Sequence, residues 1–491
     1  MLRRRKACVT HEPMTAPDAP RPKARRARGL MDRRGTGLAV ERELIARIAK
    51  VYETWGFEPL ETPAFEYADA LGKFLPDQDR PNEGVFAFED DEEWVALRYD
   101  LTAPLARFVA ENFDALPKPY RRWAAGPVWR NEKPGPGRFR EFWQCDADTV
   151  GSASPAADAE MIAMACEALE AAGVKRGGYA LKVSTRKLLD AVLNKIGVDE
   201  GAFSPRLVVL RAIDKYDRLG RAGVEALLGA GRKDESGDFT KGAGLDATQS
   251  ASVLDLVSAG EGSRSDVIAR LTDIAGAEAV AELQQIDAVL TALRVSDEQV
   301  QFDPTIVRGL EYYTGAVFEA QLIGGEGQSF GSVGGGGRYD NLVARFRGER
   351  IPATGFSIGV SRLAAALQEQ QAAEADGPVV VLVMDQARVG DAFAMADELR
   401  RAGVRAEAYL GGAGMKAQLK YADKRAAPIA VIQGGDELAK GVVTLKDLKL
   451  GAKLSATVGD DRDAWNAARE KLQREAPRAQ LVAAVREMLG T

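Results

Sequence analysis

Histidine is almost absent from this sequence of 491 residues, and the single one, His11, lies in a polar, proline-containing stretch near the N-terminus. A histidine general base or metal ligand inside a folded domain is therefore excluded, so acid–base work falls to carboxylates, tyrosines or the substrate itself. The three cysteines, Cys8, Cys145 and Cys166, lack the spacing of a disulfide framework or a zinc site, which predicts a reducing, cytoplasmic location. No apolar run reaches about 18 residues, so we expect no membrane span.

Charge of one sign is unevenly distributed along the chain. The formal net charge is −6, but residues 1–37 contain eleven Lys or Arg against three Asp or Glu, a net +8 that leaves −14 for the remainder. With few apolar residues and several prolines, residues 1–37 are expected to be a basic, disordered tail. Such a tail can contact nucleic-acid phosphates, although a solvated tail or an upstream start codon is the simpler explanation.

The chain is too long for one hydrophobic core, because cores stop growing beyond roughly 250–300 residues. Residues 38–185 and 301–368 mix helices and strands in an order that predicts an α+β core around an antiparallel sheet. A helical period covers residues 38–55. The stretches RRWAAGPVWRNE and RFREFWQCDADTVG predict two strands around a Pro/Gly loop.

Two further regions differ from this core in composition and in the pattern of their predicted elements. Residues 186–300 are rich in Ala, Leu, Asp and Gly, and they predict an inserted helical domain with a soft hinge at GRKDESGDFTKGAG. Residues 369–377 are expected to be a linker. In residues 378–491, strands alternate with helices, which predicts a small α/β domain with a parallel sheet.

The stretch VWRNEKPGPGRFREFWQCDAD carries an unusual set of polar side chains. Arg130 ends one predicted strand, Arg138 and Arg140 open the next, and Gln144 and Asp148 share the face of that second strand. Planar guanidinium groups bind phosphate oxygens in a bidentate manner. A solvated strand face with salt bridges is the alternative, and it is weakened by the neighbouring aromatic residues.

A second polar stretch, LRYDLTAPLARF, places Asp100 and Thr102 at a strand-to-helix turn. Thr102 is a suitable helix N-cap, and Asp100 is a candidate to hold a substrate ammonium group.

Two glycine-containing stretches complete the candidate site. RGLEYYTGAVFE brings Arg308, Tyr312 and Tyr313 close to a run of four glycines at 334–337, which either allows close approach to a ligand or forms a flexible hairpin loop. FSIGVSRL places Arg362 in the first turn of a predicted helix, where phosphate is favoured.

The order of these stretches resembles that of class II aminoacyl-tRNA synthetases. ETPAFEY, with Pro63, is similar to their motif 1 strand, WRNE followed by GRFREF to motif 2, and GFSIGVSRL to motif 3. RGLEYYTG and GGGRYDNL resemble the two signature peptides of histidyl-tRNA synthetases. The run MKAQLKYADKRAAPIAVIQGG resembles the anticodon-binding domain of the same subclass.

The resemblance implies a class II catalytic core, a C-terminal anticodon-binding domain and the activation of L-histidine by ATP with Mg²⁺, followed by transfer to tRNA(His). It assigns the α-phosphate to Arg130 and Arg308, and the rest of ATP to Glu132, Arg138 and Arg362. The resemblance implies a histidine pocket made by Asp100, Thr102, Arg130, Gln144, Asp148, Arg308, Tyr312 and Tyr313. No metal site made by protein groups alone is implied, and a homodimer is expected through the region of Pro63.

Three alternatives stay open at this stage. One is the synthetase-like regulatory subunit of ATP phosphoribosyltransferase, a non-catalytic binding protein that lacks the anticodon-binding domain and commonly loses the signature arginines. The others are a class II synthetase for another amino acid, and a nucleic-acid-binding module acting through the basic tail.

Overall fold

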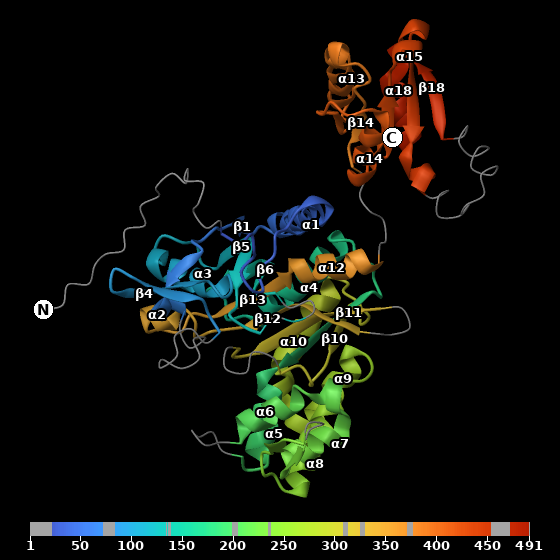
Figure 1. Cartoon of the computed structure of the whole chain (residues 1–491). Coiled ribbons are helices and arrows are strands. Elements are labelled where there is room, and N and C mark those ends of the chain that lie inside the picture. The colour runs from blue at the N-terminus through green and yellow to red at the C-terminus, as the bar shows by residue number, and fades with distance from the viewer. Residues whose placement is uncertain are drawn as a thin grey trace, which may run out of the picture. The chain divides into compact units, whose positions relative to one another are not determined.

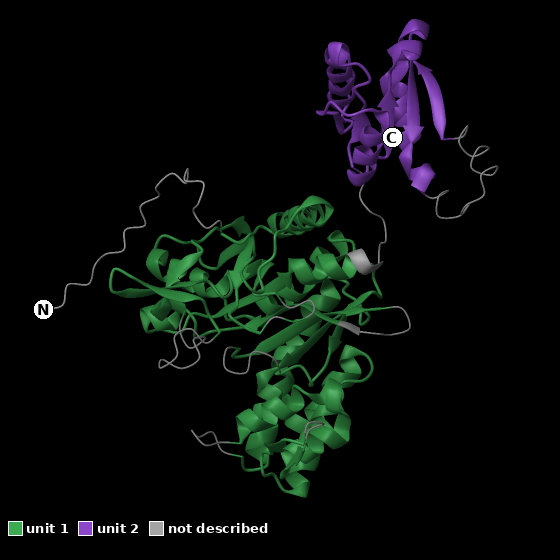
Figure 2. Ribbon diagram, in the orientation of Figure 1, with its two compact units in different colours: residues 1–372 green, residues 373–491 purple. Residues whose placement is uncertain are grey.

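The structure is a computed structural model that describes ten ranges of the chain. It forms two compact units, residues 1–372 and 373–491 (Figure 2). Their boundary falls inside the linker predicted at 369–377. Among the described residues, no helix is both long enough and apolar enough to cross a membrane. The described residues are 22–71, 84–133, 135, 139–198, 205–233, 237–307, 313–324, 329–370, 377–452 and 472–490.

An eight-stranded sheet is the centre of the first unit, in the order β1-β5-β6-β13-β12-β11-β7-β10 (Figure 1). The six inner strands pair antiparallel, and only the short edge strands β1 and β10 pair parallel. The predicted antiparallel α+β core is therefore confirmed. In sheet order the strands are Glu58–Pro59, Tyr120–Trp129, Glu141–Val150, Ala353–Gly359, Ser329–Arg338, Ala316–Ile323, Tyr179–Thr185 and Val300–Phe302.

The two faces of this sheet differ because side chains alternate along each strand. Helices α1 (Gly35–Thr54), α4 (Pro155–Ala171), α10 (Ala277–Ala292) and α12 (Val360–Gln370) pack against it. On the helix-covered face, apolar residues from β6, β13 and β11 join one large core, including Cys145, Ala147, Phe318, Phe356 and Ile358. The alternate positions of β6 carry Gln144, Asp146 and Asp148, so the opposite face is polar.

The run of glycines at 334–337 lies within the central strand β12 and not in a hairpin loop. A Cβ atom on Gly334 would lie 2.8 Å from the ring of Phe356, and one on Gly336 would lie 2.5 Å from the ring of Phe318. These two rings stack with centroids 6.0 Å apart. The glycines therefore let two phenylalanines of neighbouring strands pack over β12.

A three-stranded sheet in the order β2-β4-β3 lies beside the large sheet and contains the predicted motif 1 strand. Its strands are β2 (Phe65–Tyr67), β3 (Ala87–Asp90) and β4 (Glu93–Leu97). On one face of this sheet, Ala96 packs against the helices α2 (Ala68–Leu71) and α3 (Thr102–Asn112). A short helix, α11 (Ala344–Arg347), also contacts α3.

The predicted helical region 186–300 is mainly helical, and its core is continuous with that of the large sheet. Leu188, Val253 and Leu271 belong to the same buried cluster as Phe318, because α10 and α5 link the helices to β7. The predicted hinge contains an antiparallel hairpin, β8 (Gly231–Lys233) and β9 (Phe239–Lys241). The helices are α5 (Arg186–Lys195), α6 (Arg206–Ile213), α7 (Tyr216–Leu228), α8 (Ala247–Val257) and α9 (Arg264–Ala275).

The second unit is built on a five-stranded sheet in the order β15-β14-β16-β17-β18. The first three strands are parallel, as predicted, but β17 and β18 add antiparallel pairs, so the sheet is mixed. The strands are β14 (Val379–Val381), β15 (Ala406–Ala408), β16 (Ile429–Ile432), β17 (Val442–Asp447) and β18 (Gln473–Pro477). The helices are α13 (Val389–Arg401), α14 (Met415–Lys424), α15 (Gly435–Lys440) and α18 (Leu481–Leu489).

The predicted boundary of the basic tail, residue 37, lies too far toward the C-terminus. Helix α1 begins at Gly35, and a turn is already formed where the Leu30 N–H donates to the Ala27 carbonyl at 3.2 Å. Residues 22–34 are therefore described as structure, whereas 1–21 lie outside the described residues.

Candidate active site

Arg130 lies at the end of β5 with its guanidinium in contact with two aromatic rings. The group is 4.3 Å from the centroid of Tyr99 and 4.9 Å from that of Phe142, contacts that hold a cation by the ring quadrupole and dispersion. Its Nε is buried and has no hydrogen-bond partner among the described residues. Arg130 is therefore a positioned cation whose donors are not used by a described carboxylate.

Asp100 and Thr102 form the turn that leads from β4 into α3. Asp100 Oδ1 accepts hydrogen bonds from the backbone N–H of Thr102 at 3.1 Å and of Ala103 at 2.9 Å. The expectation that the Thr102 side chain caps the helix is wrong, since Thr102 is the first helical residue and the accepting oxygen belongs to Asp100. The carboxylate satisfies two of the N–H groups left over at a helix start.

Asp148 lies near the end of β6 and pairs with an arginine that is not among the predicted site residues. Arg122, directly opposite on β5, is completely buried, and its Nη2 lies 2.7 Å from Asp148 Oδ2. The same Nη2 donates to the Leu101 carbonyl at 2.9 Å. The Tyr339 hydroxyl donates to Asp148 Oδ1. Asp148 is thus held by Arg122 of β5 and by Tyr339, the residue after β12, and Arg122 is itself bound to the carbonyl of Leu101.

Gln144 and Asp146 occupy the same strand face as Asp148. Gln144 Nε2 donates to the Ser357 hydroxyl of β13 at 2.7 Å. The amide oxygen of Gln144 and the Oδ1 of Asp146 are buried without a partner among the described residues. Unsatisfied buried polar atoms of this kind are expensive to maintain, which makes this face a candidate site for a polar ligand.

Burial is the largest cause of the pKa shifts of Asp146 and Asp148. Burial raises the pKa of Asp146 to about 8, with a further increase from Asp148 and an opposing effect of Arg122. Burial also raises the pKa of Asp148, against the opposing effect of Arg122. Burial opposes ionisation of Arg122, but Asp148 and Asp146 outweigh it and raise its pKa. A cation placed beside the two carboxyl groups would favour their charged forms.

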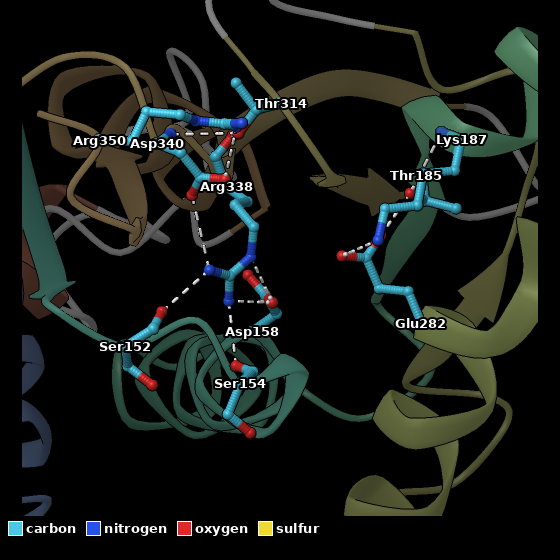
Figure 3. Close-up of polar contacts among 10 residues, drawn as sticks. All are labelled: Ser152, Ser154, Asp158, Thr185, Lys187, Glu282, Thr314, Arg338, Asp340 and Arg350. Atoms are coloured by element: carbon cyan, nitrogen blue, oxygen red, sulfur yellow. Dashed lines mark hydrogen bonds and ion pairs between the residues drawn. The ribbon is translucent and has the colours of Figure 1, made fainter. Parts of the chain in front are cut away.

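The GGGRYD peptide contributes two buried side chains on opposite faces of the sheet. Arg338 points to the helix-covered face, where its Nε donates to Asp158 Oδ2 at 3.0 Å and its other nitrogens donate to the carbonyls of Ser152 and Ser154 (Figure 3). Tyr339 reaches Asp148 on the polar face. Arg338 therefore fixes β12 to the start of α4.

Tyr313 lies where the chain enters β11. The Thr314 N–H donates to the Arg338 carbonyl at 2.7 Å, and the Asp340 N–H donates to the Thr314 hydroxyl at 3.1 Å (Figure 3). A Cβ on Gly337 would lie 2.8 Å from the Tyr313 ring. The ring is therefore packed against the end of the glycine run.

Arg362 lies in the first turn of α12 and is exposed. The helix start is tied to β6 because the Trp143 N–H donates to the Ser361 hydroxyl at 3.2 Å. Gly359, just before α12, pairs with Gln144 in the sheet. The helix N-terminus therefore begins beside the polar strand that holds Gln144.

Of the remaining predicted site residues, the structure describes one and leaves three outside the described ranges. Glu132 follows Arg130 and is half-buried. Arg308, Tyr312 and Arg138 lie outside the described residues. Within the described part of the chain, no three His, Cys, Asp or Glu side chains form a group that could hold a metal ion.

The sheet, its polar face and the separate C-terminal unit define a class II aminoacyl-tRNA synthetase, as comparison with known proteins shows. A family model described as "Histidyl-tRNA synthetase" matches residues 29–363, and one described as "Anticodon binding domain" matches residues 378–464. The chain belongs to the histidyl-tRNA synthetase family. The predicted ligase function and fold class are thereby confirmed.

Individual relatives agree with this assignment over nearly their whole length. The chain is 58% identical over 486 residues to a histidine–tRNA ligase of Caulobacter vibrioides, covering 96% of this chain and 97% of the relative. It is 54% identical over 492 residues to that of Brucella ovis, covering 96% and 97%. A crystal structure of histidyl-tRNA synthetase from Nostoc is similar with a TM-score of 0.73 and 28% identity, over 95% of this chain and all of that one.

Proposed function

We propose that the polar face of the large sheet carries out both steps of histidine–tRNA ligation. A carboxylate oxygen of L-histidine attacks the α-phosphorus of ATP, and the bond to pyrophosphate breaks. The terminal ribose hydroxyl of tRNA(His) then attacks the carbonyl carbon of the histidyl-adenylate, and AMP leaves. The observation that carries this proposal is Arg130, a cation held against two rings at the end of β5 without a described carboxylate partner.

Arg130 is proposed to contact the carboxylate and the α-phosphate, because a preorganised cation offsets charge that builds on the phosphorus in the transition state. Arg308 shares this role from the segment before Tyr313. Glu132 and Arg138 act near the adenine and the distal phosphates, and Arg362 acts at the γ-phosphate. The start of α12 supports this role for Arg362, since helix N-termini favour anions.

The acids of the polar face are proposed to bind the histidine substrate. Asp100, Thr102, Gln144 and Asp148 surround its ammonium and ring nitrogens, and Tyr312 and Tyr313 form the wall of the imidazole pocket. The buried Arg122–Asp148 pair supports this assignment, because it fixes a carboxyl group before the substrate arrives. No protein imidazole takes part in either step.

The remaining partners are proposed at the level of the whole chain. Mg²⁺ enters with ATP, where it neutralises phosphate charge. The C-terminal unit contacts the tRNA anticodon, and the reaction takes place in the cytoplasm. Two copies pair through the region of Pro63, and this dimer is supported by Phe65 and Tyr67 of β2, which are 50% and 55% exposed.

Exchange of radioactive pyrophosphate into ATP tests the first step without tRNA. Arg130→Ala should lower the rate by about 10²–10³-fold, the usual cost of removing one donor from a developing anion. The matched control is Arg121→Ala, which removes an arginine from the same strand but from the opposite face, where it pairs with Glu160 at 3.0 Å. Near-normal exchange in Arg130→Ala would exclude the proposed role.

The regulatory-subunit alternative is opposed by two observations. The chain contains the anticodon-binding domain that such a subunit lacks, and the arginines at positions 130, 308 and 362 are all present.

A further inference from the structure

Residues 22–34 form a short basic segment in front of α1. Lys23, Arg25, Arg26 and Arg28 are all exposed. None of these four has an ion-pair partner in the part of the chain that the structure describes. Because the sequence beyond residue 37 has a net charge of −14, four unpaired cations in one segment are a marked local reversal of charge.

The C-terminal end of this segment is attached to the start of β6. The Arg140 N–H donates to the Gly29 carbonyl at 3.0 Å, and Arg140 Nη1 donates to the Arg28 carbonyl at 3.1 Å. Gly29 has φ +78°, and a Cβ there would lie 2.5 Å from Arg140 Cδ. Only a glycine therefore fits this close approach without strain.

Arg33 provides further attachment points. Its guanidinium lies 4.8 Å from the Trp143 ring of β6, and it pairs with Glu41 of α1. The path of the chain is thus fixed between residues 28 and 33, and the four cations begin directly at this fixed point.

The attachment point is also part of the motif 2 arm, the stretch of residues 130–140. The Arg130 N–H donates to the Arg140 carbonyl at 2.9 Å, so Arg140 joins the basic segment on one side and Arg130 on the other. Lys23 is five residues before Arg28, and at about 3.6 Å per residue it lies within about 18 Å of it. The four cations are therefore confined near the arm that carries Arg130.

We infer that the basic segment binds phosphates of the tRNA acceptor arm and holds its 3′ end at Arg130. This inference rests on the proposed function, because it requires the ribose at the end of tRNA to reach the adenylate. Exposed arginines and lysines supply the sequence-independent part of nucleic-acid affinity by releasing counterions from phosphates. Attachment to the motif 2 arm distinguishes the segment from a freely solvated tail, since its charge is delivered to one place.

The test uses the full chain with Lys23, Arg25, Arg26 and Arg28 all changed to Ala. The dissociation constant for tRNA(His) should rise by roughly 10-fold at about 0.1 M salt, and the slope of log Kd against log salt should fall by roughly 2–3, as expected for three or four lost phosphate contacts. Pyrophosphate exchange should stay within 2-fold of wild type, since that reaction needs no tRNA. A minihelix that contains only the acceptor arm should show the same loss of affinity.

A matched control changes Arg3, Arg4, Arg5 and Lys6 to Ala, which removes the same number of cations from residues in front of the segment. We expect this variant to bind tRNA with close to wild-type affinity. The inference is overturned if both variants weaken binding equally, if the first variant leaves Kd and its salt slope unchanged, or if the minihelix shows no loss. Absence of exchange in the wild-type chain would instead reject the proposed function.

Discussion

At the scale of single residues, a completely buried arginine holds the acid that is proposed to bind the substrate. Arg122 binds Asp148 from the neighbouring strand, and Tyr339 binds its other oxygen. We predict that Asp148→Asn raises the KM for histidine about 100-fold in pyrophosphate exchange. It should also lower the free energy of unfolding by roughly 3–5 kcal/mol, because it leaves a buried arginine unpaired.

Tyr339→Phe is the comparison variant for Asp148→Asn in the pyrophosphate exchange assay. It removes one hydrogen-bond donor to Asp148 but leaves the ion pair with Arg122 intact. Its KM for histidine should rise less than about 10-fold. An unchanged KM in Asp148→Asn would remove Asp148 from the histidine pocket.

Asp146 predicts a pH dependence of stability in the ligand-free protein. Burial raises its pKa from 3.8 to about 8, so between these values the folded state binds more protons than the unfolded state. Its contribution to stability is complete below about pH 4 and is lost as pH rises toward 8. Asp146→Asn has no such titration. The melting temperature of Asp146→Asn minus that of wild type should therefore increase by a few degrees from pH 5 to pH 8.

Thermal melts of both proteins at pH 5, 6, 7 and 8 provide the measurement. A constant difference in melting temperature across this range would show that Asp146 ionises normally in the folded chain.

Part of the site could be predicted from residues alone. Gln144 and Asp148 were selected by their alternation on one strand, which the sheet register confirms. Asp146 has the same parity and could have been found by the same argument. Arg122 could not, because its role depends on which residue of a distant strand lies opposite it. The helix cap was assigned to Thr102 in place of Asp100, since both residue types are good caps and only the backbone path decides between them.

At the scale of elements, the glycine run shows how backbone space is used inside a sheet. A Cβ on Gly336 would lie 2.1 Å from the Gly355 carbonyl oxygen, whereas one on Gly335 would meet, within 4 Å and apart from its two chain neighbours, only the Phe318 carbonyl oxygen at 3.5 Å among the described atoms. Gly336→Ala should therefore lower the free energy of unfolding by about 3 kcal/mol, as expected for an overpacked core. Gly335→Ala is the control and should cost less than about 1 kcal/mol.

Urea denaturation of the two variants checks this prediction. Equal stability of Gly336→Ala and Gly335→Ala would mean that the sheet adjusts freely at this point and that the two phenylalanine rings do not require the glycines.

Most elements were predictable because their hydrophobic periods are regular. The helix expected at 38–55 is α1, and strands alternate with helices in the C-terminal unit as predicted, from β14 as far as β17. Strands β8 and β9 are not predicted from the sequence, because each is only three residues long and lies in a stretch rich in glycine and charged residues. Strand β12 was ambiguous because glycine has low strand propensity, and here packing against Phe318 and Phe356 overrides it.

At the scale of the whole molecule, the face of the small sheet that carries Phe65, Tyr67 and Phe88 is apolar and exposed. We predict that wild type sediments as a dimer of the 52.8 kDa chain and that Phe65→Glu shifts it toward the monomer, because a buried unpaired charge is costly. Phe239→Glu is the control, since Phe239 is 61% exposed but lies in the helical region. A monomeric wild type, or a Phe65→Glu dimer of unchanged affinity, would contradict this interface.

The most direct measurement for the whole account is pyrophosphate exchange with each of the twenty amino acids in turn. We predict exchange with histidine and at most trace exchange with the other nineteen. The reason is that the buried carboxyl groups of the polar face are proposed to select a substrate that presents both an ammonium group and ring N–H donors. Exchange that depends on another amino acid, or the absence of exchange with all twenty, would contradict the proposed reaction.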